Sequence, residues 1–174
     1  MAKSIFRPNF TKQDLQKWIA RCQERALQSL IDLLTDTGEF FIENAKMGGE
    51  YTDRTGNLRA SIGYVVAHNG KAIRLSDFQP EQGKPFHTVE FTTKDGKNVR
   101  FKARVQQFDG SIGANRGRDF AGELASQYPQ GLVLIMCAGM EYALFVEANG
   151  YDVITGAAMR AKMYLGKRLR TMLN

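Results

Sequence analysis

Histidine, cysteine and acidic side chains are the groups that metal or acid–base chemistry would need, and here they are scattered. The two histidines, His68 and His87, fall in separate predicted hairpins. Neither Cys22 nor Cys137 has a partner at metal-ligand spacing. Both cysteines lie within apolar patterns, so we interpret them as small core residues of a protein in a reducing cytoplasm. The sequence therefore predicts no metal site and no cofactor.

The best candidate for catalysis is Asp53, which stands with Arg54 just before Gly56. A carboxylate in that place also caps a helix, and that structural role is sufficient to explain it. Glu39 and Glu43 lie one helical turn apart, as on a solvated helix face. The chain has no Gly-x-Ser-x-Gly motif and no phosphate-loop lysine. We predict no catalytic residues and no enzyme, with a small hydrolase as the third interpretation.

The element that opens the chain is a long helix, predicted over residues 11–47. Thr11 and Asp14 have the spacing of a capping box, and Gly48-Gly49 provides the stop. Gly38 is the one position where we expect a break or kink. Apolar residues recur at near-helical spacing, with a second row in the later turns that predicts burial on more than one side: Leu15, Ile19, Cys22, Ala26, Leu30, Leu33 and Phe40, then Leu27, Ile31, Leu34, Phe41 and Ile42.

A short turn and a hairpin follow. Asp53 or Thr55 is expected to cap a single helical turn. Residues 62–68 and 71–76 flank Asn69-Gly70, which is the strongest two-residue hairpin signal.

A second hairpin is predicted from residues 86–93 and 97–107. A three-residue loop ending in a left-handed Gly96 pairs Phe91 with Val99 and Val89 with Phe101, which keeps apolar residues on one face. The opposite face then carries Arg100, Lys102 and Arg104, and we interpret the hairpin as a basic arm used in assembly.

The glycine-rich stretch 110–122, with Arg116 and Arg118, is predicted to be a mobile loop that extends this arm. Its backbone N–H groups and arginines also suit a phosphate, although the spacing matches no nucleotide motif. We expect the arm and this loop to become ordered only on assembly.

The end of the chain again gives clear signals. The apolar run 132–138 predicts a strand at the centre of a sheet, and residues 151–154 suggest a further short strand. A last helix is expected over residues 156–173. These elements describe a single α+β domain spanning residues 1–174. In it a long N-terminal helix and a C-terminal helix pack on a small antiparallel sheet, and residues 77–131 form an inserted arm.

Charge is distributed unevenly along the 174 residues, whose net charge is +6. Residues 97–118 carry six basic groups against one acid, and residues 157–174 carry five basic groups and no acid. This polarity suits an acidic partner, which is either another protein surface or nucleic acid bound without sequence preference. No apolar run reaches the roughly 18 residues of a membrane-spanning helix.

Two short segments carry a resemblance to a known family. The first is the run of residues 52–62, and the second is Glu141-Tyr142-Ala143-x-x-Val146-Glu147 followed by a glycine. In this order, after a long first helix, they resemble the signature of the tail-component family of long-tailed bacteriophages, the neck or tail-completion proteins. The residues that match are Asp53, Thr55, Gly56, Asn57, Leu58, Arg59, Ser61, Ile62, Tyr142, Ala143, Glu147 and Gly150.

The resemblance implies a structural virion protein of a phage or prophage. Members of this family form a ring, typically of six subunits, that caps the head-proximal end of the tail tube and docks to the head connector. The expected partners are therefore other copies of the chain, the tail tube protein and the head connector protein, assembled in the host cytoplasm. A basic nucleic-acid-binding module is the alternative that the residues themselves support.

Overall fold

The long first helix, α1 (Lys12–Gly48), begins at the predicted capping box. The computed structural model of the chain describes residues 10–83, 86–104 and 109–173. Thr11 Oγ1 accepts the N–H of Asp14 at 3.2 Å, and the Asp14 carboxylate accepts the N–H of Thr11 at 3.0 Å. The 37 residues of α1 extend for about 55 Å at a rise of about 1.5 Å each.

No break occurs at Gly38, and the expectation of a kink there is wrong. The ring of Tyr64 lies so close that a Cβ atom at position 38 would come within 2.5 Å of it. Glycine is therefore needed at this position for close packing of the helix on a strand, and the helix continues through it.

A three-stranded antiparallel sheet lies across α1. Its strands are β1 (Ile62–His68), β2 (Lys71–Leu75) and β5 (Leu132–Ala138), in the order β2-β1-β5. The turn at Asn69-Gly70 joins β1 to β2 as predicted, with both residues at positive φ. The strand at 132–138 is confirmed, but its expected central place is wrong, because β1 is the middle strand. Helices cover both faces of the sheet, and this explains why β5 carries apolar side chains on both of its faces.

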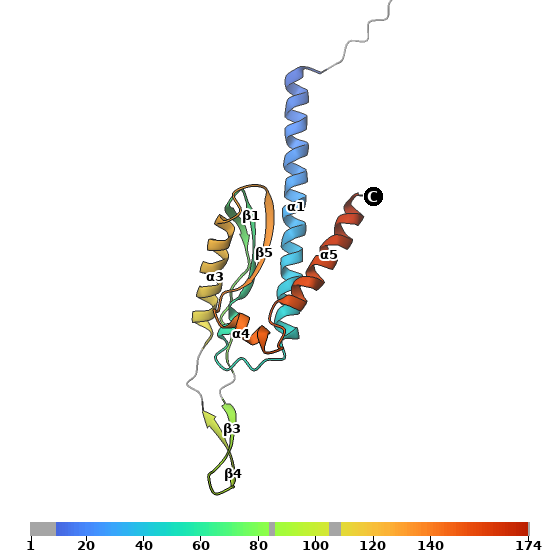
Figure 1. Cartoon of the computed structure of the whole chain (residues 1–174). Helices are drawn as coiled ribbons and strands as arrows, with labels where there is room; N and C mark the ends of the chain where they lie inside the picture. The colour runs from blue at the N-terminus through green and yellow to red at the C-terminus, as the bar shows by residue number, and fades with distance from the viewer. Residues whose placement is uncertain (1–9, 84–85, 105–108, 174) are drawn as a thin grey trace, which may run out of the picture.

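The sheet lies between two helical layers (Figure 1). It separates two hydrophobic cores. Tyr64 faces α1, whereas its neighbour Val65 contacts the core beneath α3 (Ser111–Ser126), which covers the other face. Alternate residues of β1 therefore serve different cores, as the two-residue period of a strand requires. This explains why β1 is buried along almost its whole length.

Helix α3 occupies the stretch that we predicted to be a mobile glycine-rich loop, so that expectation is wrong. Gly113, Ala114, Gly117, Ala121 and Ala125 are all buried. They form one face of small residues that brings the helix backbone close to the short helix α2 (Asn57–Ala60) and to β1. A Cβ at Gly117 would lie 2.6 Å from the carbonyl oxygen of Ser61. The glycines therefore serve tight helix packing rather than chain flexibility.

The second hairpin has the predicted register. Strands β3 (Phe86–Thr92) and β4 (Asn98–Arg104) pair Phe91 with Val99 and Val89 with Phe101. Gly96 has a φ of 76°, the left-handed conformation that the three-residue loop requires. Residues 105–107, included in the predicted strand, lie outside the described residues. The hairpin extends away from the rest of the molecule (Figure 1).

Three further helices complete the fold: α2 (Asn57–Ala60), α4 (Ala143–Ala148) and α5 (Thr155–Leu173). The last packs along the second half of α1, where the rings of Phe40 and Tyr164 stack at 4.6 Å. The strand expected at 151–154 is absent: this described segment forms the turn into α5, with Val153 buried in the core. The α+β class, with two terminal helices and small antiparallel sheets, is confirmed.

Candidate assembly surfaces

Asp53 holds the sharp turn that leads from α1 into the sheet. Its Oδ1 accepts the N–H of Gly56 at 2.9 Å, and its Oδ2 accepts the N–H of Arg59 at 2.8 Å. Gly56 has a φ of 75°, and a Cβ there would also meet the backbone of Glu81. Both carboxylate oxygens are therefore occupied by backbone donors, as in a helix cap.

Arg59 ties this turn to the end of α1. Its guanidinium donates to the carbonyl oxygens of Lys46 at 2.6 Å and Gly49 at 2.8 Å, and it lies over the ring of Tyr51 at 5.1 Å. The last carbonyls of a helix have no partner within the helix, so Arg59 satisfies groups that would otherwise need water. Asn57 adds a link to α3, because its Oδ1 accepts the N–H of Gly113 at 3.0 Å.

Glu147, in the second motif, caps α5. Its Oε1 accepts the N–H groups of Ile154 at 2.8 Å and Thr155 at 2.9 Å, and its Oε2 accepts the Thr155 hydroxyl at 3.0 Å. Partial burial acts to raise the pKa of Glu147, but these hydrogen bonds outweigh it and the pKa is lowered. Gly150 follows at a φ of 89°, where the chain turns back toward this cap.

The two motifs meet in space, although about 80 residues separate them in the sequence. Leu58 and Ile62 from the first and Ala143 from the second share one hydrophobic core. The pKa of Tyr142 is raised, first by its partial burial and then by the nearby carboxylate of Asp53. Ser61, which is fully buried, donates its hydroxyl to the carbonyl of Leu58. The motif residues form a packed corner that fixes α1, α3, the sheet and α5 relative to one another.

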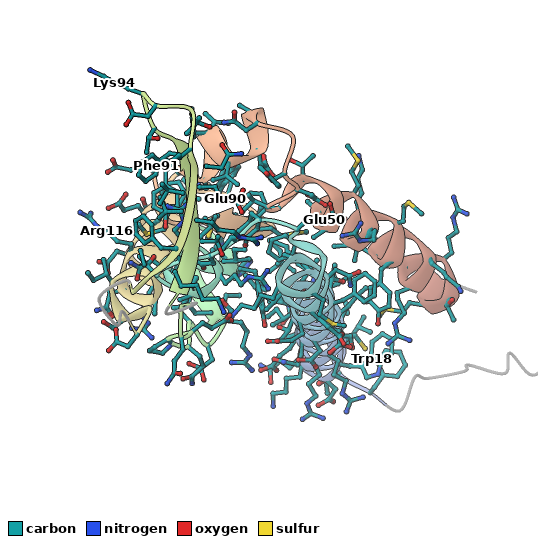
Figure 2. The ribbon with its side chains drawn as sticks, turned by 90° about the horizontal axis from the view of Figure 1, so that it is seen from below. Trp18, Glu50, Glu90, Phe91, Lys94 and Arg116 are labelled. Carbon is teal, nitrogen blue, oxygen red and sulfur yellow. The ribbon has the colours of Figure 1, made fainter. Side chains whose placement is uncertain are left out.

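The cationic residues predicted to form one arm are divided between two places. Arg100 and Lys102 lie on the hairpin, where Arg100 pairs with Glu90 at 2.7 Å and both side chains are well exposed. The side chain of Arg104 lies outside the described part of the chain. Arg116 and Arg118 project from α3, so their assignment to a loop extending the arm is wrong. Figure 2 shows Arg116 on α3 and Lys94 pointing outward at the tip of the hairpin.

Several large apolar side chains are exposed on the parts that extend beyond the sheet, and the sequence analysis did not identify them as surfaces. The first half of α1, residues 12–30, carries Trp18, which is 62% exposed, with Leu15 and Ile19 beside it. Phe91 and Phe101 of the hairpin are each about half exposed and meet edge to face at 6.4 Å. An apolar stripe of this kind can be recognised in the sequence. The sequence does not show whether the surface that covers the stripe belongs to the same chain or to another one.

A groove of about 450 Å³ separates α3 from α4. Apolar side chains of Phe120, Met140 and Leu144 line it, and Leu144 is 76% exposed. The charged side chains in its lining are four acidic ones and one basic one: Asp119, Glu123, Glu141 and Glu147, with Arg116. The groove therefore combines apolar side chains with a net negative charge.

Chemistry at a site would need groups that could bind a metal ion or act as a nucleophile. The described residues contain no group of three or more His, Cys, Asp or Glu side chains that could hold a metal ion. Burial raises the pKa of the Cys137 thiol to about 12, which keeps it protonated. No helix among the described residues is both long enough and apolar enough to cross a membrane.

Comparison with known proteins finds no matching family model, no matching curated protein and no matching solved structure.

Proposed function

We propose that the chain is a structural subunit of a phage or prophage particle, a tail-completion or neck protein. In this role it forms a ring at the head-proximal end of the tail tube and docks to the head connector. The observation that carries the proposal is the contrast between a packed corner built from the motif residues and apolar surfaces left exposed on the projecting parts. A subunit whose work is assembly needs both, because a rigid body positions the surfaces that partners cover.

The chemistry of the corner supports an architectural role for the motif. The polar side chains of the corner form hydrogen bonds with backbone groups at helix ends, and this holds for Asp53, Arg59 and Glu147. A general base needs an oxygen within hydrogen-bond reach of a substrate proton. Those oxygens are here engaged in holding the fold, which is the work expected of a scaffold.

The test is whether head–tail joining needs the chain. A phage or prophage that lacks it should yield filled heads and complete tails that remain separate, visible by electron microscopy. Purified protein added to such a lysate should restore joined, infectious particles. An Asp53→Ala variant that remains soluble but loses the corner should restore fewer. Joined particles in the absence of the chain would contradict the proposal.

A second candidate, nucleic-acid binding without sequence preference, rests on the hairpin alone. Its exposed cations suit phosphates, and Phe91 and Phe101 are exposed aromatic rings of the kind on which bases stack. Filter binding across a salt series distinguishes the two functions. Nanomolar DNA affinity that falls steeply with salt favours this candidate, whereas weak binding favours the structural subunit.

A further inference from the structure

The hairpin β3–β4 presents an apolar face that its own chain leaves uncovered. Val89, Phe91, Val99 and Phe101 share that face, and the two phenyl rings are half exposed. Among the described residues, neither strand packs extensively on any helix or strand apart from its partner in the hairpin. A two-stranded hairpin alone is marginally stable in water, so this one gains stability when another surface covers it.

The groove between α3 and α4 has the complementary character. Its lining includes the apolar side chains of Phe120, Met140 and the strongly exposed Leu144, and four of its five charged side chains are acidic. Residues 86–104 carry five basic side chains against two acidic ones. The hairpin is a ribbon only two strands wide. Lysine side chains at its tip and on the face opposite the apolar residues are long enough to reach past its edges toward the acidic side chains of the groove. Apolar surface meets apolar surface, and a basic element meets an acidic one.

We propose that the hairpin of one copy inserts its apolar face into the α3–α4 groove of a second copy. Among the side chains that the structure describes, none from β3 or β4 lines the groove of its own chain, and the hairpin extends away from the body that carries the groove (Figure 1). Donor and acceptor surfaces differ, so the contact is head-to-tail and repeats until the rotation closes a ring. This inference rests on the proposed ring subunit and specifies which surfaces join its copies.

A charge-swap experiment on the whole protein tests the pairing. The arm variant carries Lys97→Glu and Lys102→Glu, and the groove variant carries Asp119→Lys and Glu123→Lys; all four positions are exposed. Sedimentation velocity over a concentration series should show self-association of the wild type. Each variant alone should associate about tenfold more weakly or worse, because its contact now joins like charges. An equimolar mixture of the two, and the chain with all four changes, should regain association.

Matched controls separate this pairing from a general charge effect. Asp32→Lys with Glu43→Lys reverses two exposed acids on α1 outside the groove and should leave association unchanged. Phe91→Ser and Leu144→Ser should each weaken association, and no charge swap should rescue it. Far-ultraviolet circular dichroism verifies that each variant is folded.

The inference is overturned by a wild type that stays monomeric, by reversed variants that associate normally, or by a mixture that does not recover. An equal loss in the α1 control would mean that association responds to overall charge and not to this pairing, and would also overturn it. These outcomes are distinct from failure of the proposed function. If this pairing fails while head–tail joining still requires the chain, only the choice of surfaces is wrong.

Discussion

The body of the molecule and the parts that project from it treat the same kinds of side chain in opposite ways. On α1, Phe41 is fully buried between the sheet and α5, whereas Trp18, six turns earlier, is 62% exposed. Phe78 is buried beneath α3, whereas Phe91 stands half exposed on the hairpin. The core of the body covers these aromatic side chains, whereas those on the projecting parts stay exposed; on the body itself Leu144, in the α3–α4 groove, is also exposed. The comparison separates the buried side chains that hold the fold from the exposed ones that we propose to be covered by assembly partners.

Two aromatic residues on α1 provide the largest expected difference. Phe41→Ala should lower the free energy of unfolding by about 3–5 kcal/mol, because it opens a cavity in a packed core. Trp18→Ala should change the free energy of unfolding by less than about 0.5 kcal/mol, since this ring is exposed and is not part of a hydrophobic core. Urea denaturation followed by circular dichroism measures both. A loss of similar size at Trp18 would mean that the first half of α1 is already covered in the free protein.

Two glycines in α3 sharpen the same contrast within one helix. Gly113→Ala should destabilise the protein by about 1–3 kcal/mol, because the new methyl group falls on the backbone carbonyl of Asn57. Gly122→Ala meets nothing within 4 Å and should stabilise it by about 0.5–1 kcal/mol through helix propensity. Thermal unfolding of the two variants gives opposite shifts in Tm. Shifts of the same sign would contradict the close packing of α3.

Two buried tyrosines should respond in opposite directions to loss of the hydroxyl. Tyr64 donates to Glu39 at 2.7 Å, so Tyr64→Phe should cost about 1–2 kcal/mol. The Tyr51 hydroxyl is buried without a partner among the described residues, so Tyr51→Phe should be neutral or stabilising by up to about 1 kcal/mol.

The pKa of Tyr51 adds a pH test of that comparison. Burial raises this pKa to about 12, from 10.0 for an exposed tyrosine. Ionisation of Tyr51 therefore leaves the free energy of unfolding unchanged below pH 10. As the pH rises from 10 toward 12, the phenol ionises more readily in the unfolded chain, so stability is lost. The Tyr51→Phe variant should lose less stability than the wild type over this alkaline range in chemical denaturation. Equal losses would argue against burial of the phenol.

Glu147 provides the smallest effect, again through pH. Its pKa is lowered from the ordinary 4.5 by the amides that it caps, so its stabilising contribution is present above pH 4.5 and is lost as the pH falls through the folded-state pKa. Glu147→Gln should therefore lower Tm at neutral pH, and the difference from wild type should shrink in acid. Glu24→Gln, an exposed change on α1, is the control and should show no such trend. A difference independent of pH would contradict the cap.

Local sequence rules predicted the elements whose signals are local. The capping box at Thr11, the turn at Asn69-Gly70 and the register around Gly96 follow from a few adjacent residues, and all are confirmed. Helix α3 was missed because glycine weakens helix propensity. The small-residue spacing of Gly113 and Gly117 gains its meaning only from the backbone that they approach.

Position within the fold was harder to predict than the type of element. The apolar run of β5 looks like a central strand, yet it lies at an edge that helices cover on both faces. The apolar stripe of α1 likewise predicts a buried face, but it does not show which element or partner covers that face. For the candidate site, the sequence indicated the motif residues. It did not indicate that Arg59 and Glu147 serve helix ends or that a groove lies between α3 and α4.

The most direct test of the central claim is a cryo-electron microscopy reconstruction of the head–tail junction in particles that contain this chain. We expect a closed ring of copies between connector and tail tube, with the α1–sheet–α3 bodies resolved and their projecting parts covered by neighbouring subunits. Density for the chain elsewhere in the particle, or a junction built without it, would rule out a neck subunit.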